Sequence, residues 1–587
     1  MSTREAIAEA VRAAVDLAAA DLGWPAEARG APVEVERPKE PGHGDYASPV
    51  AMRLARLVRR KPLEIAHALR ARMPRMDAVE AVEVAPPGFV NVRLAAAWVA
   101  RQADVIASAG PDFGRSTRLR GQRIQVEYIS ANPTGPMTVA NARGGPLGDV
   151  LANVLAFVGA DVTREHYEND TGVQIEQLAR SVALRYRELF GEQVTIPEDA
   201  YPAEYVVDIA KEIREREGDR YVGMSIDEQA KAFAPKAIAV IVGEWHPRAA
   251  ERFGIHYDVW YRETTLLGSG YFQATIDELR RLGALEDRDG AVWLRSRELG
   301  EDIESVVIRS NGIPTYLGVD IAYHRHCLVE RGFDRKIDIW GANTHGHMRR
   351  MRAAMRALGL LDRWDVVIYQ YVRFLHEGTL LRMAKRSGQF LLLEDVIDAV
   401  GVDVARWFYL QVSPERHLDF DFELAVQQSN DNPVYYVQYA HARIASILRT
   451  ATDRGLSPDG ADVSLLVASA ELDLIKQCLR LPELLDDVLE LRAVHLLTGY
   501  ALELAGMFHA YYRDHRVVGD DEGLSRARLR LVQAVQVTLR QVLGLIGVGV
   551  PERIPVEVAS VRPAGSVPPL MDHANGDCPP VMASVWL

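Results

Sequence analysis

Apolar residues recur every three or four positions in several long stretches of the chain, which is the spacing of one face of an α-helix. After Gly144 the pattern includes Leu147, Val150, Leu151, Val154, Leu155 and Val158. It is also strong over 472–504 and 529–546, so we expect residues from about 401 to 553 to form an all-α domain.

Short apolar runs predict buried strands at 126–129, 337–340 and 366–369. From about 116 to 400 such runs alternate with helical patterns, which is typical of a doubly wound α/β domain of the Rossmann type. The stretch from about 175 to 300 is rich in charged helical segments, and we interpret it as an insertion in this domain.

Residues 1–115 predict a small α+β domain in front of the α/β domain. Ser2 is suited to cap an amphipathic helix, 51–72 contains two more helical stretches, and a turn at 85–88 leads into an alternating strand. The last segment, 554–587, is rich in proline and weakly periodic, so it is expected to be a disordered tail.

Composition narrows the class of protein. The 587 residues carry a formal net charge of −13, which argues against nonspecific affinity for nucleic acid over the whole surface. We find neither a secretion signal nor an apolar run of about 18 residues, so we expect a cytoplasmic protein without membrane contact. Cys327, Cys478 and Cys578 are too far apart for a zinc site or a disulfide framework. Basic stretches at 53–61 and 349–356 are interpreted as solvated helix faces.

A turn follows the strand at 126–129 and precedes the helix that starts near Gly144. Its sequence, Asn132-Pro133-Thr134-Gly135-Pro136, contains the residues that break regular structure. Backbone N–H groups at the start of a helix lack internal partners and stabilise an anion such as a phosphate. By itself the arrangement favours an ordinary βα unit over a nucleotide site.

The residues around this turn resemble the first signature region of arginyl-tRNA synthetases, which are class I aminoacyl-tRNA synthetases. Ser130-Ala131-Asn132-Pro133 matches the start of that region and Asn169-Asp170-Thr171-Gly172-Val173-Gln174 matches its end. The family's His-x-Gly-His element is replaced by Thr138-Val139-Ala140-Asn141. Other stretches with family resemblance are 43–47, 87–91, 316–324, 341–347, 381–388 and 430–443.

The resemblance implies an ATP site. Expected at ATP are Pro133, Gly135, Thr138, Ala140, Asn141, Met383 and Lys385, and the catalytic group comprises Thr138, Asn141, Arg382 and Lys385. Thr138 and Asn141 stand near the positions of the family's histidines, and their hydroxyl and amide groups also donate hydrogen bonds. Lys385 lies in the equivalent of the Lys-Met-Ser-Lys-Ser loop and is expected to stabilise charge on the phosphates.

The resemblance also implies a site for arginine. A guanidinium has five donors and no acceptor, so its selection needs fixed acceptors such as a carboxylate. Asp320 is expected to accept the guanidinium, and Tyr316 to bound its plane. The full set expected around arginine is Glu127, Ser130, Asn132, Tyr316, Asp320 and Asn343.

Two regions are expected to contact tRNA. In the N-terminal domain Phe89 and Asn91 are candidates, because an aromatic ring stacks on a base and an amide reads its edge; burial in the strand is an equally good interpretation. In the helical domain, which resembles the anticodon-binding domain, the candidates are Tyr436, Gln438, Tyr439 and His441. Some of these must pack inward, since Tyr436, Gln438 and Tyr439 do not share one helical face.

The implied function is that of an arginine–tRNA ligase, which forms arginyl-adenylate from L-arginine and ATP and transfers arginine to the terminal adenosine of tRNA(Arg). The family resemblance implies Mg²⁺ that enters with ATP, no dedicated metal site, and a monomer. Two alternatives stay open. One is a related protein that binds tRNA or arginine without aminoacylation, because the His-x-Gly-His element is altered. The other is a class I synthetase for a different amino acid.

Overall fold

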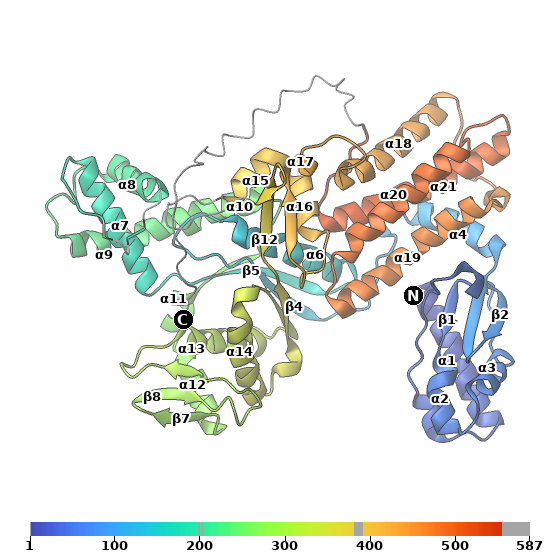
Figure 1. Cartoon of the computed structure of the whole chain (residues 1–587), viewed down its shortest axis with the longest axis horizontal. Coiled ribbons are helices and arrows are strands. Elements are labelled where there is room, and N and C mark those ends of the chain that lie inside the picture. The colour runs from blue at the N-terminus through green and yellow to red at the C-terminus, as the bar shows by residue number, and fades with distance from the viewer. Residues whose placement is uncertain (1, 198–199, 202–203, 381–390, 554–587) are drawn as a thin grey trace.

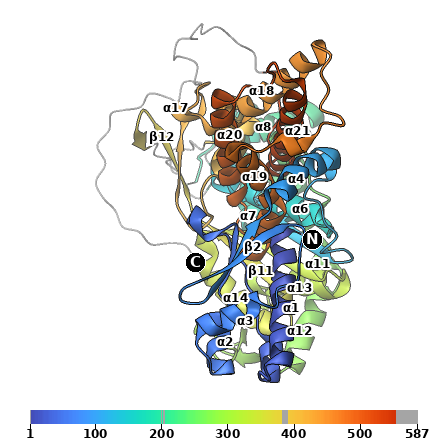
Figure 2. The same ribbon diagram turned by 90° about the vertical axis from the view of Figure 1, so that its right-hand side faces the viewer.

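The computed structural model describes residues 2–197, 200–201, 204–380 and 391–553. A parallel sheet lies at the centre, the inserted helices extend to one side of it, and a bundle of long helices lies on the other side (Figure 1). In the views of Figures 1 and 2 the N-terminal helices lie at the opposite end from α18 (Pro433–Asp453). The predicted tail at 554–587 lies outside the described residues.

The central sheet has five parallel strands in the order β11-β10-β4-β5-β6. Their bounds are β4 Arg123–Tyr128, β5 Asp161–Glu168, β6 Val259–Arg262, β10 Arg335–Gly341 and β11 Trp364–Tyr369. The chain fills the sheet outward from β4 on one side and then returns to place β10 on its other side. The predicted doubly wound fold is confirmed, and β4 and β10 flank the point where the strand order reverses.

Helix α6 (Gly144–Phe157) covers β4 at very short distance. A Cβ atom at Gly148 would collide with the ring of Tyr128, so only glycine allows this approach of helix to strand. The predicted apolar positions of this helix are buried, including Val150 and Leu151. The close contact fixes the start of the helix relative to the end of β4.

The stretch expected to be an insertion, 175–300, is not separate from the sheet over its whole length. It forms the helices α7 Val173–Leu189, α8 Glu204–Glu217, α9 Ile226–Val240, α10 His246–Arg252, α11 Glu263–Gly268 and α12 Tyr271–Arg281. It also supplies β6, which pairs with β5 in the main sheet, and β7 (Leu285–Arg288) and β8 (Ala291–Leu294) of a small sheet with β9 (Val306–Ile308). The apolar run of β6 is short and was hidden among charged helices.

The N-terminal residues form the predicted α+β unit. Its elements are α1 Thr3–Asp21, β1 Tyr46–Ser48, α2 Val50–Val58, α3 Pro62–Arg70, β2 Val79–Ala85 and β3 Phe89–Leu94, with the strands in the order β1-β3-β2. Ser2 caps α1 through a capping box with Glu5, as predicted. Glu483 of the C-terminal helices accepts hydrogen bonds from Arg37 Nε at 2.9 Å and from the Tyr46 hydroxyl at 2.6 Å.

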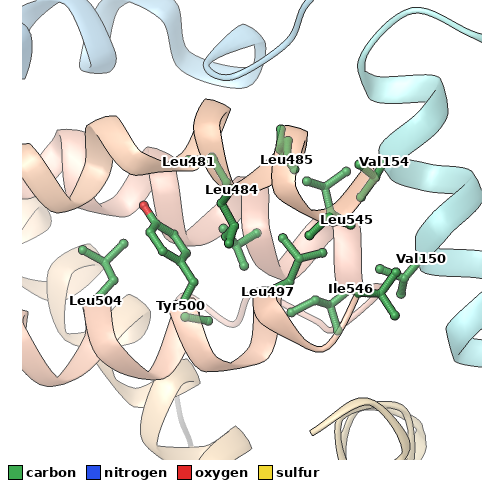
Figure 3. Packing of buried hydrophobic residues seen from close by; sticks show 14 of the residues in the cluster. Val150, Val154, Leu481, Leu484, Leu485, Leu497, Tyr500, Leu504, Leu545 and Ile546 are labelled. Carbon is green, nitrogen blue, oxygen red and sulfur yellow. The ribbon is translucent and has the colours of Figure 1, made fainter. Parts of the chain in front are cut away.

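The C-terminal part is helical from α18 onward, as predicted. The expected all-α range of 401–553 was wrong at one place, because Leu418–Asp421 form the strand β14, which pairs with β12 (Val372–His376) and buries the alternating residues Leu418 and Phe420. Besides α18 the C-terminal part contains α19 Ser469–Leu491, α20 Leu496–Asp514 and α21 Glu522–Ile546, and α4 (Ala96–Ala109) packs against this bundle. Leucine side chains of α19, α20 and α21 interdigitate and meet Val150 and Val154 of α6 (Figure 3). The bundle and the Rossmann-type sheet therefore share one continuous core.

A second link between these parts runs through a buried cation. Arg406, on α16 (Val402–Leu410), has no exposed surface and contacts Asp149 of α6 at 2.5 Å. Its guanidinium also donates to the carbonyl oxygen of Ile546 at 2.9 Å. Because a buried guanidinium needs several acceptors, this contact fixes the end of α21 against α6.

The basic stretch at 349–356 lies on α14 (His345–Ala357). Arg349 contacts Glu301 at 3.1 Å, and Arg350 and Arg356 donate to backbone carbonyls of Glu304 and Leu299. These arginines hold the loop 299–304 in place, so they are less free than the predicted solvated helix face. The remaining elements are α5 Val139–Ala142, α13 Tyr316–Arg325, β12 Val372–His376, β13 Thr379–Leu380, α15 Leu393–Val400, β14 Leu418–Asp421 and α17 Phe422–Ala425.

Candidate active site

A cavity of about 670 Å³ opens at the carboxyl ends of β4 and β10. This is where ligands bind in doubly wound sheets. It is lined by eight of the residues predicted from the sequence: Glu127, Ser130, Asn132, Ala140, Asn141, Tyr316, Asp320 and Asn343. The whole set predicted for arginine is thus brought together from three separate stretches of the chain, 127–132, 316–320 and 343.

Three of the predicted residues that the structure describes do not line this cavity. They are Pro133, Gly135 and Thr138, which lie in or after the turn beside it. Arg382, Met383 and Lys385 lie outside the described residues. The described chain continues at Leu391, whose carbonyl oxygen accepts a hydrogen bond from the N–H of Val139 at 3.1 Å. Residue 391 therefore lies beside the start of α5, which carries Ala140 and Asn141.

The end of β4 has an unusual backbone. Ile129 and Ser130 both have positive φ, at 68° and 41°, which non-glycine residues rarely adopt. The bend brings the Ser130 hydroxyl back to Glu127, where it donates to Oε1 at 2.9 Å. The same oxygen of Ser130 accepts from the backbone N–H of Tyr167 at 3.2 Å. The strained bend thus directs the side chains of Glu127, on β4, and Ser130, just after it, toward the cavity.

Glu127 is almost completely buried and contacts the ammonium of Lys336 at 2.6 Å. Burial raises the pKa of Glu127 to about 7, although the neighbouring Lys336 lowers it. The carboxyl group consequently changes its charge close to neutral pH. A further cation placed against it would favour the ionised form.

Asp320 lies on α13 and is contacted by two histidines. One carboxylate oxygen is 2.5 Å from His347 Nε2, and the other is 3.0 Å from His324 Nδ1. Burial alone would raise the pKa of Asp320, but the charge of His324 and the hydrogen bonds outweigh it and hold the pKa well below its usual range. Asp320 is therefore an anion at the cavity wall, suited to a cationic ligand.

The aromatic side of the cavity lies next to this carboxylate. Tyr316, one turn before Asp320 on α13, is 56% exposed, and its ring centroid lies 4.8 Å from that of His347. Trp340, at the end of β10, lies 5.4 Å from the same histidine ring. Planar groups beside an anion suit a planar cation, because π faces attract positive charge.

The altered signature element begins α5. The Thr138 hydroxyl donates a hydrogen bond of 3.1 Å to the amide oxygen of Asn141. That contact directs the Asn141 oxygen toward Thr138 and leaves its amide N–H₂ group as the donor on this residue. The altered element thus retains one donor at the cavity, in place of the two histidines of the family pattern.

Buried side chains hold the turn between β4 and α5 from behind. His166 Nε2 accepts from the N–H of Ala131 at 3.2 Å, and burial lowers the pKa of His166 strongly, so that the ring is neutral. His246, on α10, lies 2.8 Å from the carbonyl oxygen of Gly135. The inserted helices therefore contribute directly to the placement of this turn.

The predicted RNA contacts differ in their surroundings. Phe89 is half-buried and Asn91 is buried. For Asn91 the structure therefore agrees with the second interpretation given above, in which the side chain is buried in the strand. His441 is also buried, with Nδ1 at 3.1 Å from the carbonyl oxygen of Pro551. We expected the ring of His441 to be accessible to RNA, but His441 lies on the face of α18 that packs inward, so the ring is covered.

The other three candidates on α18 are half-buried. The rings of Tyr436 and Tyr439 both lie against the ring of His509, at centroid distances of 4.7 Å and 5.9 Å. Gln438 donates to Asp403 at 2.8 Å. Tyr439 lines a surface groove of about 940 Å³ together with Arg443. As expected, the three side chains do not all share one face of the helix.

Sequence reasoning assigned no role to several residues at or behind the cavity, among them the charged or titratable residues His324, Lys336, Asp338 and His347. Lys336 and Asp338 alternate with apolar residues in β10, Lys-Ile-Asp-Ile-Trp, and both are completely buried. The sequence did contain a signal for Lys336 and Asp338, since charged residues at alternate positions of a predicted buried strand need charged or polar partners. Their partners lie on other elements and were not identifiable from one sequence.

Among the described helices, none is both long and apolar enough to cross a membrane. Within the same residues, no group of three or more histidine, cysteine or acidic side chains is arranged to hold a metal ion. Cys327 and Cys478 are buried and unbridged, and Cys578 lies outside the described residues.

Comparison with known proteins gives the family. Three family models match the chain: "Arginyl tRNA synthetase N terminal domain" over 2–94, "tRNA synthetases class I (R), catalytic domain" over 111–408, and "DALR anticodon binding domain" over 437–554. An arginine–tRNA ligase of Carboxydothermus hydrogenoformans is 42% identical over 525 residues, covering 89% of this chain and 94% of the relative. One from Moorella thermoacetica is 43% identical over 525 residues, covering 89% of this chain and 93% of the relative.

Solved structures agree on the fold. Thermus thermophilus arginyl-tRNA synthetase superimposes with a TM-score of 0.75 at 22% identity, covering 94% of this chain and 100% of that one. Eight of the residues that the sequence placed in the site, Glu127 and Asp320 among them, line one cavity of this fold. The chain belongs to the arginyl-tRNA synthetases, a family of class I aminoacyl-tRNA synthetases.

Proposed function

We propose that the cavity at β4 and β10 activates L-arginine with ATP, and that the chain acts as an arginine–tRNA ligase. One observation carries the assignment of the substrate: Glu127 and Asp320 line the same cavity from different elements. Arginine has a cation at each end, so two separate carboxylates in one cavity match its charge pattern.

Each residue has a role in this proposal. Asp320 accepts the guanidinium and Tyr316 lies along its plane, while Glu127 accepts the α-ammonium. Asn132 and Asn343 contact one oxygen of the substrate carboxylate. The other carboxylate oxygen is left free to attack ATP.

In the first step, a carboxylate oxygen of arginine forms a bond to the α-phosphorus of ATP. The bond from this phosphorus to the bridging oxygen breaks, and pyrophosphate leaves with its electron pair. Asn141 donates a hydrogen bond to the phosphates and Lys385 stabilises their charge. In the second step, a hydroxyl oxygen of the terminal adenosine of tRNA forms a bond to the arginyl carbonyl carbon. The bond from this carbon to the phosphate oxygen breaks, AMP leaves with the electron pair, and the hydroxyl proton passes to the AMP phosphate.

Mg²⁺ accompanies ATP in this proposal and is held by the phosphates. Support comes from the chemistry of the cavity: its carboxylates Glu127 and Asp320 already contact Lys336 and histidines. The ion would neutralise phosphate charge. The monomeric state and the cytoplasmic location stay predictions from the family resemblance.

The test is ATP–pyrophosphate exchange with each amino acid, in the presence and absence of tRNA(Arg). We expect exchange with arginine and background with the other nineteen, because a site built for a guanidinium leaves its acceptors unpaired with other side chains. Exchange with another amino acid would contradict the assignment of Asp320. No exchange with any amino acid, with or without tRNA, would favour the alternative of a binding protein without activity.

A variant sharpens this test. Asp320→Asn keeps the shape of the side chain and removes its charge, so we expect kcat/KM for arginine to fall on the order of 10²- to 10³-fold. The KM for ATP should stay within about twofold. Asp365→Asn is the control, because Asp365 lies on β11 and pairs with Arg335 and Arg492 outside the cavity.

A further inference from the structure

Glu127 and Asp320 are the two ends of one chain of charged side chains. Lys336 Nζ lies 2.6 Å from Glu127 and 2.6 Å from Asp338. The other oxygen of Asp338 lies 2.8 Å from His324 Nε2, and His324 Nδ1 lies 3.0 Å from Asp320. Alternating anions and cations thus connect the two carboxylates without a gap.

The three middle members of this chain do not line the cavity. Lys336, Asp338 and His324 each have no exposed surface. Lys336 and Asp338 lie on β10, next to β4, which carries Glu127, whereas His324 lies on α13, which carries Asp320. A ligand in the cavity would meet the end members only.

We propose that Lys336, Asp338 and His324 are positioning residues that fix the distance between the two carboxylates and thereby select an amino acid with a cation at each end. The inference rests on the proposed function, because it concerns how that site recognises arginine. None of the three touches the substrate. Their effect passes through Glu127 and Asp320.

The geometry gives the physical reason. A carboxylate on a free side chain would rotate, and placement within about 0.5 Å is needed for full use of a contact. Each end carboxylate has one oxygen held by the chain and the other held at the cavity: Ser130 contacts Glu127, and His347 contacts Asp320. Asp338 is itself fixed by the indole N–H of Trp364 at 2.5 Å.

The charges of the chain complement the ligand. Its three carboxylates face two internal cations, so an ionised chain has one excess negative charge near the substrate. Burial and the neighbouring Lys336 lower the pKa of His324, but Asp320 and Asp338 outweigh them and raise it to about 10. His324 is therefore a cation at neutral pH and keeps Asp320 ionised. The guanidinium then meets a carboxylate that is already charged and oriented.

Asp338→Asn is the first test, because it has nearly the same shape and removes the central anion. We expect the KM for arginine in ATP–pyrophosphate exchange to rise about 10- to 100-fold, which is the usual effect of losing a group that orients a binding residue. The KM for ATP should stay within about twofold of its value in the unchanged chain. The preference for arginine over citrulline, a neutral analogue of the same length, should fall by a similar factor. Asp365→Asn, the same change on the adjacent strand outside the cavity, should resemble the unchanged chain in all three.

Thermal unfolding shows whether Asp338→Asn folds, and a second variant, His324→Gln, tests the inference if it does not. The glutamine keeps a hydrogen-bond donor toward Asp338 but removes the cation beside Asp320. Like Asp338→Asn, it should therefore lower the preference for arginine over citrulline. If both folded variants keep the arginine KM and the preference of the unchanged chain, the inference is wrong. If the unchanged chain itself shows no arginine-dependent exchange, the proposed function fails instead, so the two failures are distinguishable.

Discussion

The hydroxyl of Tyr205, on α8, donates a hydrogen bond of 2.7 Å to the carbonyl oxygen of Thr134. Thr134 lies in the turn between β4 and α5, so an inserted helix supports the backbone beside the proposed ATP site. The tyrosine ring also packs over Gly135, where a Cβ atom would come within 3.0 Å of it. This contact gives the inserted helices a role in placing the turn.

Tyr205→Phe should weaken ATP use without unfolding the chain. Loss of one hydrogen bond costs about 1 kcal/mol, so we expect the KM for ATP to rise up to about fivefold, with the KM for arginine unchanged. Exchange kinetics at varied ATP concentration measure this. Tyr186→Phe is the matched control, because its hydroxyl donates to the carbonyl oxygen of Gly218 within the inserted helices. An equal effect of both changes would contradict a specific role of Tyr205.

Asn141→Ala tests the altered signature element. If the Asn141 amide replaces a histidine donor at the phosphates, its removal should lower kcat by up to about 10²-fold. Asn141→His restores a ring N–H donor and should keep kcat within about tenfold of the unchanged chain. Asn311→Ala removes an amide from an exposed turn and should have no effect. Unchanged kcat in Asn141→Ala would assign the phosphate contact to other residues.

The raised pKa of Glu127 predicts that arginine binding depends on pH. Burial raises this pKa to about 7, so the carboxyl is neutral below that pH and ionised above it. Because the ionised form binds the ammonium, the KM for arginine should rise about tenfold from pH 8 to pH 6. The KM for ATP serves as an internal comparison. Glu127→Gln should have a high arginine KM with little dependence on pH. A flat profile in the unchanged chain would contradict a Glu127 pKa near 7, and an unchanged arginine KM in Glu127→Gln would exclude Glu127 as the ligand of the ammonium.

Much of the fold could be predicted from the sequence. The three apolar runs became β4, β10 and β11, adjacent strands of one sheet, because such runs satisfy burial on both faces. The periodic stretch after Gly144 became α6, and the C-terminal stretches became α19, α20 and α21. β6 was missed because four residues among charged helices give too short a pattern.

Exposure was the weaker part of the prediction. His441 and Asn91 have the residue types of RNA contacts, yet both are buried. A single sequence does not specify which side of a helix or strand meets solvent when apolar and polar residues are mixed on it. The neighbours that cover His441, such as Pro551, are more than 100 positions away.

From the sequence alone came most of the long helices, three strands of the central sheet, the family resemblance and the residue types of the proposed site, because periodicity and local motifs depend on near neighbours in the chain. Only the tertiary structure decided that Glu127 and Asp320 line one cavity and are joined through Lys336, Asp338 and His324. The reason is physical: charge pairing acts over a few ångströms in space, and these contacts join residues from β4, β10 and α13. The pKa values that govern the site arise from that pairing and from burial.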